Sequence, residues 1–405
     1  MEVKRTLGLL LALSLLLIPG GCWSRDEIEK LSIVKAVGLD LVNIGGRAKW
    51  QVSHSIIQPA NMGHQAGQQG GGQGQKPEWL VVGLGDTIRE AERNNSTRNP
   101  RRDYLDHLFI YVVGEKVARE GMHIVIGTWM REPGFRLRPW LLVAEGQAMD
   151  ILAAEPELER TLASEIAGII ENGLPVVSKG YALPFKDFAL QLATPGQDAV
   201  AARVELSKPR GGEQPAAGGP EADRKAVRIN GMAVFRKDRL AGWMKDRETL
   251  GYLYVIGEVR EAMIPLKLPW YRRDDVSISM TGSRSKIKAR VEGGRVTMFI
   301  DIVAEGELAE VVETNEIANP DTIDLVEREL AREIRSLAED SIRQAQQEFR
   351  ADIFGFGHRL RKVNPGAWKA MEENWYDIYP TVEVVLNVKT TVRGTGMTVN
   401  TPGIR

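Results

Sequence analysis

One residue of the chain has a side chain suited to covalent chemistry in an exported protein, the thiol of Cys22. It is the only cysteine among 405 residues. It follows an apolar run that begins at Leu7 and breaks at Pro19, with Gly20 and Gly21 directly before the thiol. About a dozen apolar residues are fewer than the roughly 20 that span a bilayer, and the basic pair upstream is typical of an export signal. We therefore predict that a lipoprotein signal peptide, residues 1–21, is removed and that Cys22 is diacylated.

The residues before Cys22 depart from the usual lipoprotein processing pattern at one position. That pattern has leucine three places before the cysteine, whereas this chain has Pro19 there, preceded by Leu17 and Ile18. Two alternatives stay open: an ordinary signal peptide with an incidental cysteine, or an uncleaved anchor. We favour lipidation because a single cysteine is otherwise a leftover thiol in an exported protein.

The sequence contains no catalytic or metal-binding pattern with a supporting context. Ser283 and Lys286 match a Ser-x-x-Lys motif, but they enter a predicted strand, whereas that motif opens a helix in penicillin-binding enzymes. Nucleophile-elbow, phosphate-binding and dinucleotide-binding motifs are absent. We therefore expect a protein that is not an enzyme, without catalytic residues, cofactor or metal. No two of the histidines have helical metal-ligand spacing: His54, His64, His107, His123 and His358.

The composition is that of an ordinary globular protein, with 43% hydrophobic and 26% charged residues. A net charge of −1 gives no reason to expect a nucleic acid or a strongly anionic surface as partner. With one cysteine no internal disulfide can form, so core packing alone must stabilise the fold. No later segment approaches membrane-spanning length, so we expect the part after Cys22 to be soluble and held to a membrane only by lipid.

Hydrophobic periodicity in the first half predicts an N-terminal α/β domain over residues 22–205. Residues 33–42 and 50–56 are predicted to form a hairpin that turns at 43–46. A Gly/Gln-rich stretch at 59–77 cannot bury enough apolar surface to order itself and is predicted to be a flexible insertion. After it strands and helices alternate, which favours a mixed sheet. The strands are expected at 79–83, 108–113 and 140–144, and the helices at 86–95, 117–130, 148–152 and 157–172.

The second half predicts a linker or loop at 206–226, a small β-rich middle domain at 227–275 and a C-terminal α+β domain at 276–405. In the last domain a hairpin turns at Gly293–Gly294, a long amphipathic helix begins at Asp321, and a final strand alternates from residue 381. The predicted fold class is therefore α+β or mixed α/β in three domains. Each is a small mixed or antiparallel sheet with helices, and the C-terminal domain has the long helix over its sheet.

Aromatic side chains gather near the end of the chain, interleaved with glycine and proline. One interpretation is that they pack over the end of the long helix and complete its core; the other is a rigid aromatic surface for another protein. We favour the core interpretation because such stripes are usually buried. The residues are Phe349, Phe354, Phe356, Trp368, Trp375, Tyr376 and Tyr379.

Four blocks together resemble the Ger(x)C family, the lipoprotein C subunits of spore germinant receptors. They keep the family's order and cover nearly the whole chain after the leader. The cysteine start and the Gly-Phe-Gly…Trp ending in one chain are the more specific features. The departures are Pro19 and the two low-complexity stretches. The blocks are Gly21–Leu31 with Ile33–Asp40, Arg136–Leu152, Ala233–Trp243 and Asp352–Trp375.

The resemblance implies a non-enzymatic protein of three mixed α/β domains on the outer face of the spore inner membrane. It implies assembly with two integral membrane subunits, one transporter-like and one channel-like, and the resemblance places lipid attachment on Cys22. Two other classes stay open from the residues alone. One is a lipoprotein that captures a nutrient in a cleft between domains, and the other is a cell-wall hydrolase.

Overall fold

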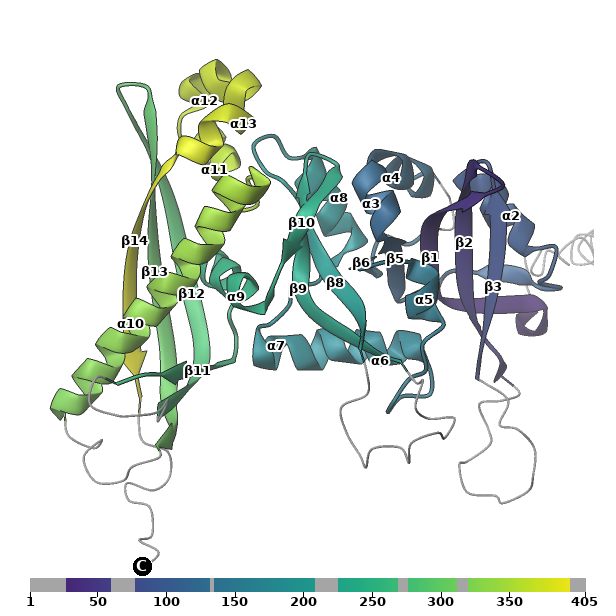
Figure 1. The fold of residues 1–405 in the computed structure, drawn as a ribbon, viewed down its shortest axis with the longest axis horizontal. Helices are drawn as coiled ribbons and strands as arrows, with labels where there is room; N and C mark the ends of the chain where they lie inside the picture. Colours follow the sequence, from purple (N-terminus) through teal and green to yellow (C-terminus); the bar gives the residue numbers. More distant parts are fainter. Residues whose placement is uncertain are drawn as a thin grey trace, which may run out of the picture.

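The structure is a computed structural model that describes residues 27–59, 77–131, 135–207, 225–268, 276–311 and 320–393. The predicted leader and Cys22 lie outside these residues, as do nearly all of the predicted insertion at 59–77 and of the predicted linker at 206–226. The described chain forms a ten-stranded and a four-stranded sheet, and both sheets carry helices (Figure 1). This confirms the predicted mixed α+β class.

The large sheet has the order β10-β9-β8-β6-β5-β1-β2-β3, with β4 beside β1 and β7 beside β6. Its centre is parallel, because β1, β5, β6 and β8 run the same way, and its two ends are antiparallel. The strands are β1 (Leu31–Ile44), β2 (Arg47–Ile57), β3 (Glu78–Gly85), β4 (Arg102–Tyr104), β5 (Ile110–Gly114), β6 (Trp140–Ala144), β7 (Leu183–Pro184), β8 (Val200–Ser207), β9 (Ala226–Arg236) and β10 (Arg239–Met244).

Helices cover both faces of this sheet, as buried parallel strands require. One face packs against α2 (Ile88–Asn95), α3 (Glu115–Glu120), α4 (His123–Trp129) and α8 (Phe185–Ala193). The other packs against α5 (Ala148–Leu152), α6 (Leu162–Gly168), the π-helical turn η3 (Ile169–Gly173) and α7 (Leu174–Val177). A short 3₁₀ turn, η1 (Ile28–Lys30), precedes β1.

Two predicted helices of this region differ in detail. The helix expected at 117–130 is two helices, because Gly121 has a φ of +136° and the Asp238 side chain contacts the backbone there. The helix expected from residue 157 begins at Leu162, after Thr161, whose hydroxyl accepts the N–H of Ser164 as an N-cap.

The second sheet has the order β11-β12-β13-β14. Its long hairpin turns at Gly293 and Gly294, both at positive φ, so the hairpin prediction is confirmed. The helix α10 (Pro320–Arg343) lies across one face of the sheet (Figure 1), with Leu330 and Ile334 fully buried. The strands are β11 (Ala262–Leu266), β12 (Val276–Glu292), β13 (Arg295–Val311) and β14 (Glu383–Val392).

A set of short helices follows α10 and closes the top of this half in Figure 1. It begins with the π-helical turn η4, in which the predicted long helix ends. The elements are η4 (Gln344–Phe349), α11 (Phe356–Val363), α12 (Pro365–Met371), η5 (Glu372–Asn374), α13 (Trp375–Ile378) and η6 (Tyr379–Thr381).

The strands predicted for a middle domain at 227–275 have no sheet of their own. β9 and β10 extend the large sheet through β8, whereas β11 pairs with β12 in the second sheet. The helix α9 (Asp246–Ile256) packs into the same apolar core as α10. A separate middle unit is therefore not seen among the described residues, because each of these strands finds its pairing partner in a neighbouring sheet. The other predicted domain boundaries stay predictions.

Candidate functional site at the junction of the two sheets

Two buried aspartates join the two halves of the molecule. Asp198 lies between α8 and β8, and Asp352 follows η4; their exposed fractions are 2% and 1%. The backbone N–H of Asp352 donates to Asp198 Oδ2 at 2.7 Å, and the N–H of Asp198 donates to the carbonyl of Asp352 at 2.8 Å. The two loops therefore bind each other reciprocally, although 154 positions separate them in the sequence.

The carboxylate of Asp352 also organises the start of α11. It accepts the backbone N–H of Phe356 at 2.9 Å and of Gly357 at 2.8 Å, and the indole N–H of Trp375 at 2.9 Å. Unpaired N–H groups at a helix start favour a carboxylate, so this contact fixes the first turn of α11 against α13.

The carboxylate of Asp198 binds the tip of the β9–β10 hairpin and a tyrosine of the other half. Its Oδ1 accepts the N–H of Lys237 at 2.7 Å and the hydroxyl of Tyr376 at 2.8 Å. The Tyr376 ring also lies beneath two cations, with Arg236 at 5.1 Å and Lys237 at 5.3 Å from its centroid. Tyr376 therefore connects α13 with the large sheet.

Burial raises the pKa of the Asp352 carboxyl to about 7, and the neighbouring Asp198 acts in the same direction. The three N–H donors oppose this shift because they favour the charged form. Burial also raises the pKa of Asp198, against the donors on Lys237, Tyr376 and Asp352. The junction thus holds two carboxyls for which ionisation is costly.

A cleft of about 630 Å³ opens beside these aspartates. The large sheet's half contributes Ile126 from α4 and Leu192 from α8, and the other half contributes Trp368, Trp375 and Tyr376. The indole N–H of Trp368 has no hydrogen-bond partner among the described residues, although its side chain is only 4% exposed.

Glycine allows the two halves to approach closely at the cleft. Gly196 has a φ of +76°, and a Cβ there would lie 2.5 Å from the backbone of Gly357. A Cβ on Gly357 would lie 2.7 Å from the Trp368 ring and from the Trp375 indole nitrogen. Any larger side chain at either position would push the loops apart.

The aromatic cluster predicted near the end of the chain is mainly core, as favoured from the sequence. Phe349 and Tyr376 are partly buried. The other five members are buried: Phe354, Phe356, Trp368, Trp375 and Tyr379.

Sequence reasoning did not single out Asp198, and it included Asp352 only as the first residue of a family block. Buried acids in loops have no periodicity that could reveal them.

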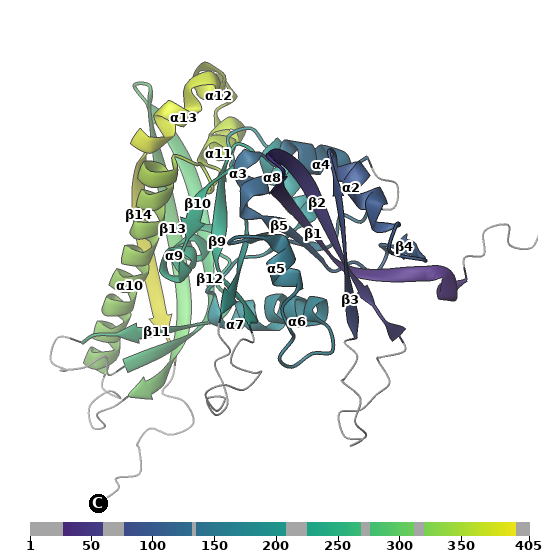
Figure 2. The same cartoon turned by 45° about the vertical axis from the view of Figure 1, so that its right-hand side comes forward.

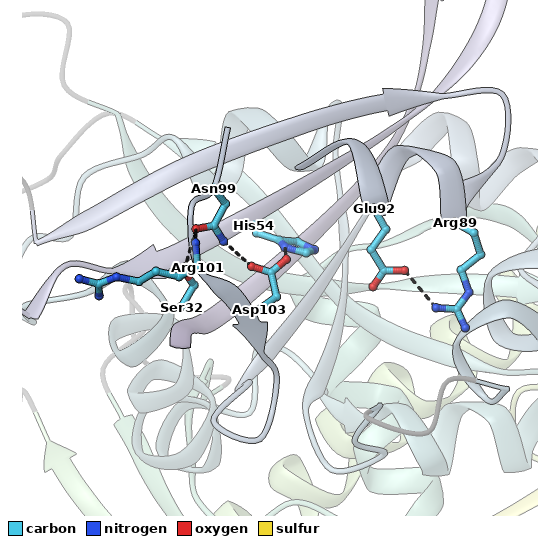
Figure 3. A network of polar contacts seen from close by, with 7 residues as sticks. All are labelled: Ser32, His54, Arg89, Glu92, Asn99, Arg101 and Asp103. Atoms are coloured by element: carbon cyan, nitrogen blue, oxygen red, sulfur yellow. Dashed lines mark hydrogen bonds and ion pairs between the residues drawn. The ribbon is translucent and has the colours of Figure 1, made fainter. Parts of the chain in front are cut away.

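The described residues do not bring the other sequence candidates together into a reaction site. Ser283 and Lys286 lie in β12, as predicted for a chance motif. His54 contacts Asp103, but the Ser32 hydroxyl donates to Asn99 instead of to His54, so this is not a catalytic triad (Figure 3). Over the same residues no cluster of His, Cys, Asp and Glu could hold a metal ion.

None of the helices in the described ranges is long and apolar enough to cross a membrane. The junction of the two halves offers an open cleft beside two buried aspartates.

Comparisons with known proteins cover both halves. Residues 24–206 match the family described as "Spore germination protein N-terminal domain", and residues 230–396 match "Spore germination B3/ GerAC like, C-terminal". The boundary between the two matches falls between β8 and β9, inside the large sheet.

Whole-chain relatives agree with these matches. The chain is 25% identical to spore germination protein KC of Bacillus subtilis (strain 168), over 97% of this chain and 96% of the relative. It is 24% identical to spore germination protein YndF of the same organism, over 96% and 97%. A crystal structure of the GerBC protein has the same fold, with a TM-score of 0.57 and 15% identity over 89% of this chain and 98% of that one. The chain belongs to the Ger(x)C family of spore germination proteins.

Proposed function

We propose that this chain is the lipid-anchored, non-enzymatic C subunit of a spore germinant receptor. Cys22 carries the main support, because the only cysteine of the sequence directly follows an export-type leader. Family membership supports the role in germination. A thioether-linked diacyl group supplies two acyl chains, which anchor a protein stably where one chain binds only marginally.

In this proposal the chain lies on the outer face of the spore inner membrane and assembles with two multi-span subunits, one transporter-like and one channel-like. It acts through interface contacts, supporting or transmitting the response of those subunits. The junction at Asp198 and Asp352 suits this role, because it holds the two halves in one arrangement. A structural change caused by a contact on one half would then be transmitted to the other half.

Replacing Cys22 by Ala tests the anchoring. We expect the variant to lose the diacylglycerol mass on its N-terminal peptide, to leave the membrane fraction of spores and to slow germination. Ser24→Ala, two positions further on, is the matched control and should behave as the unchanged protein. A Cys22→Ala protein that stays fully membrane-bound and assembles at normal levels would refute the lipid anchor.

The cleft favours a second candidate function, the capture of a nutrient between the two halves. Its observation is a cleft of about 630 Å³ that is lined from both halves, in part by Trp368, Trp375 and Leu192. A nutrient that shifts the melting temperature of the protein, with the shift lost in Trp368→Phe, would support it. Unchanged melting across a panel of amino acids, sugars and nucleosides would count against it.

A further inference from the structure

The described chain begins beside a basic loop. β1 starts at Leu31, nine positions after Cys22, and β4 pairs in parallel with its first residues, so that Leu31 lies opposite Arg102. The loop before β4 carries Arg98 and Arg101, and both are exposed. Figure 2 shows β4 and the start of β1 at the end of the molecule that lies away from the four-stranded sheet.

A buried polar network fixes this loop to the large sheet (Figure 3). Asn99, 6% exposed, accepts the Ser32 hydroxyl at 2.8 Å and the Arg101 backbone N–H at 3.1 Å. Its amide donates to Asp103 at 2.6 Å, and Asp103 in turn lies 3.0 Å from the Nδ1 of His54, which is 1% exposed. The loop conformation is therefore determined by side chains from β1 and β2.

This network leaves the loop with an outward positive charge. Asp103, in β4, is engaged by Asn99 and His54, whereas the Arg101 side chain extends away from the network (Figure 3). Within the described ranges, no ion pair involves the guanidinium of Arg98 or Arg101. The exposed acids close in sequence to the start of β1 are Glu27, paired with Lys30 at 2.7 Å, and Glu29.

We propose that Arg98 and Arg101 bind anionic lipid headgroups beside the anchor. The inference rests on the proposed lipidation of Cys22. Four residues lie between Cys22 and Glu27, where the described chain begins, and the five Cα-to-Cα steps span at most about 18 Å when extended. The loop is thus tethered close to a surface whose potential decays over about 10 Å. The overall charge of −1 hides this local excess of arginine.

The single thiol allows a test that does not depend on processing in the cell. The chain from residue 22 contains every described helix and strand, and coupling Cys22 to a maleimide with one tetradecyl chain anchors it at the native position. One chain of this length gives only marginal, reversible binding, so added contacts change the measured partition coefficient. The coupled protein is sedimented with vesicles of phosphatidylcholine, alone or with one third phosphatidylglycerol, at low and at high salt.

We expect the anionic vesicles to bind the unchanged protein more tightly at low salt, and high salt to remove the preference. Each arginine near an anionic surface contributes about fivefold, so Arg98→Ala with Arg101→Ala should weaken binding roughly 25-fold. On phosphatidylcholine alone this variant should bind like the unchanged protein. Arg98→Lys with Arg101→Lys keeps both charges and should restore most of the binding.

Arg359→Ala with Lys362→Ala removes the same charge from exposed positions on α11 and is the matched control, expected to stay within about twofold. The proposal is overturned if both double-alanine variants lose the same affinity for the anionic vesicles. It is also overturned if Arg98→Ala with Arg101→Ala loses no affinity for them. Absence of the acyl group on Cys22 in spores would refute the lipid anchor but would leave this vesicle result unaffected. The two failures are therefore distinguishable.

Discussion

At the scale of single residues, the junction depends on two carboxyls that are held by N–H and O–H donors. Asp352 accepts three N–H groups within its own half, and Asp198 accepts groups from both halves. Donors aimed at a buried carboxylate offset part of its desolvation cost, but burial still raises the pKa of both groups. The stability of the protein should therefore depend on pH near neutrality.

The sign of that dependence follows from the raised pKa. Folded Asp352, with a pKa of about 7, binds its proton more tightly than the unfolded chain does. Its contribution to stability is complete below the unfolded pKa of about 4 and is lost as the pH rises through 7. We expect the free energy of unfolding, measured with urea, to fall by about 2 kcal/mol between pH 5.5 and 7.5 from this group.

Asp352→Asn should flatten this pH profile, because the replacement cannot titrate. The variant is expected to be less stable at every pH, since an amide N–H₂ would face backbone and indole donors. The slope against pH is therefore the informative quantity. Equal slopes for the variant and the unchanged protein would show that Asp352 does not titrate in this range.

Tyr376→Phe isolates the contact between α13 and Asp198. The ring stays, but the hydroxyl that donates to Asp198 at 2.8 Å is lost, and we expect a loss of about 1–3 kcal/mol in the free energy of unfolding. Tyr254→Phe is the matched control, because the Tyr254 hydroxyl is buried without a hydrogen-bond partner among the described residues. The control should cost almost nothing. A similar loss of unfolding free energy in both variants would show that the hydrogen bond from Tyr376 to Asp198 contributes nothing particular to stability.

At the scale of elements, the second half depends on α10. Its apolar stripe packs on the four-stranded sheet, and Leu330 and Ile334 are fully buried there. Leu330→Ala should cost about 2–5 kcal/mol in urea denaturation, since it removes buried methyl groups and leaves a cavity. Glu339→Ala, on the exposed face of the same helix, should stay within about 0.5 kcal/mol. Comparable losses would mean that the helix is not packed as described.

Local patterns predicted elements well and pairings poorly. The β12–β13 hairpin and the stripe of α10 have strong periods and a Gly-Gly turn, so they were predicted from the sequence. The parallel pairing of β13 with β14 and the addition of β9 to the large sheet depend on distant partners, and no local period encodes these. The break at Gly121 likewise depends on Asp238, 115 positions away along the chain from His123.

The candidate site was likewise predictable only where it depends on neighbouring residues in the sequence. Cys22 could be proposed from the sequence because the processing of a leader is read from neighbouring residues. Asp198 and Asp352 could not be paired, because their contact exists only after both halves have folded. The basic loop was also missed, because net charge is summed over the whole chain. Figure 3 shows that the Asp103 side chain lies within the polar network, whereas the Arg101 side chain extends away from it.

At the scale of the whole molecule, the two halves are joined by hydrogen bonds and by an apolar core that both contribute to. A second contact supports the aspartates: the Ser178 hydroxyl donates to the carbonyl of Glu261 at 2.6 Å. Among the described residues, Ser178, Lys237 and Arg350 are the non-glycine residues with positive φ, and each lies at or next to these contacts. Such strained conformations persist only where the surrounding structure determines them. Contact with a partner on one half could therefore be passed to the other.

The central claim is that this chain is a subunit that assembles with multi-span membrane proteins. Its most direct test is affinity purification of the chain, tagged at its C-terminus, from detergent-solubilised spore membranes, with mass spectrometry of the proteins that accompany it. The account predicts two multi-span proteins, one transporter-like and one channel-like, recovered with the unchanged protein and depleted with Cys22→Ala. Recovery of the tagged protein from those membranes without any multi-span partner would contradict it.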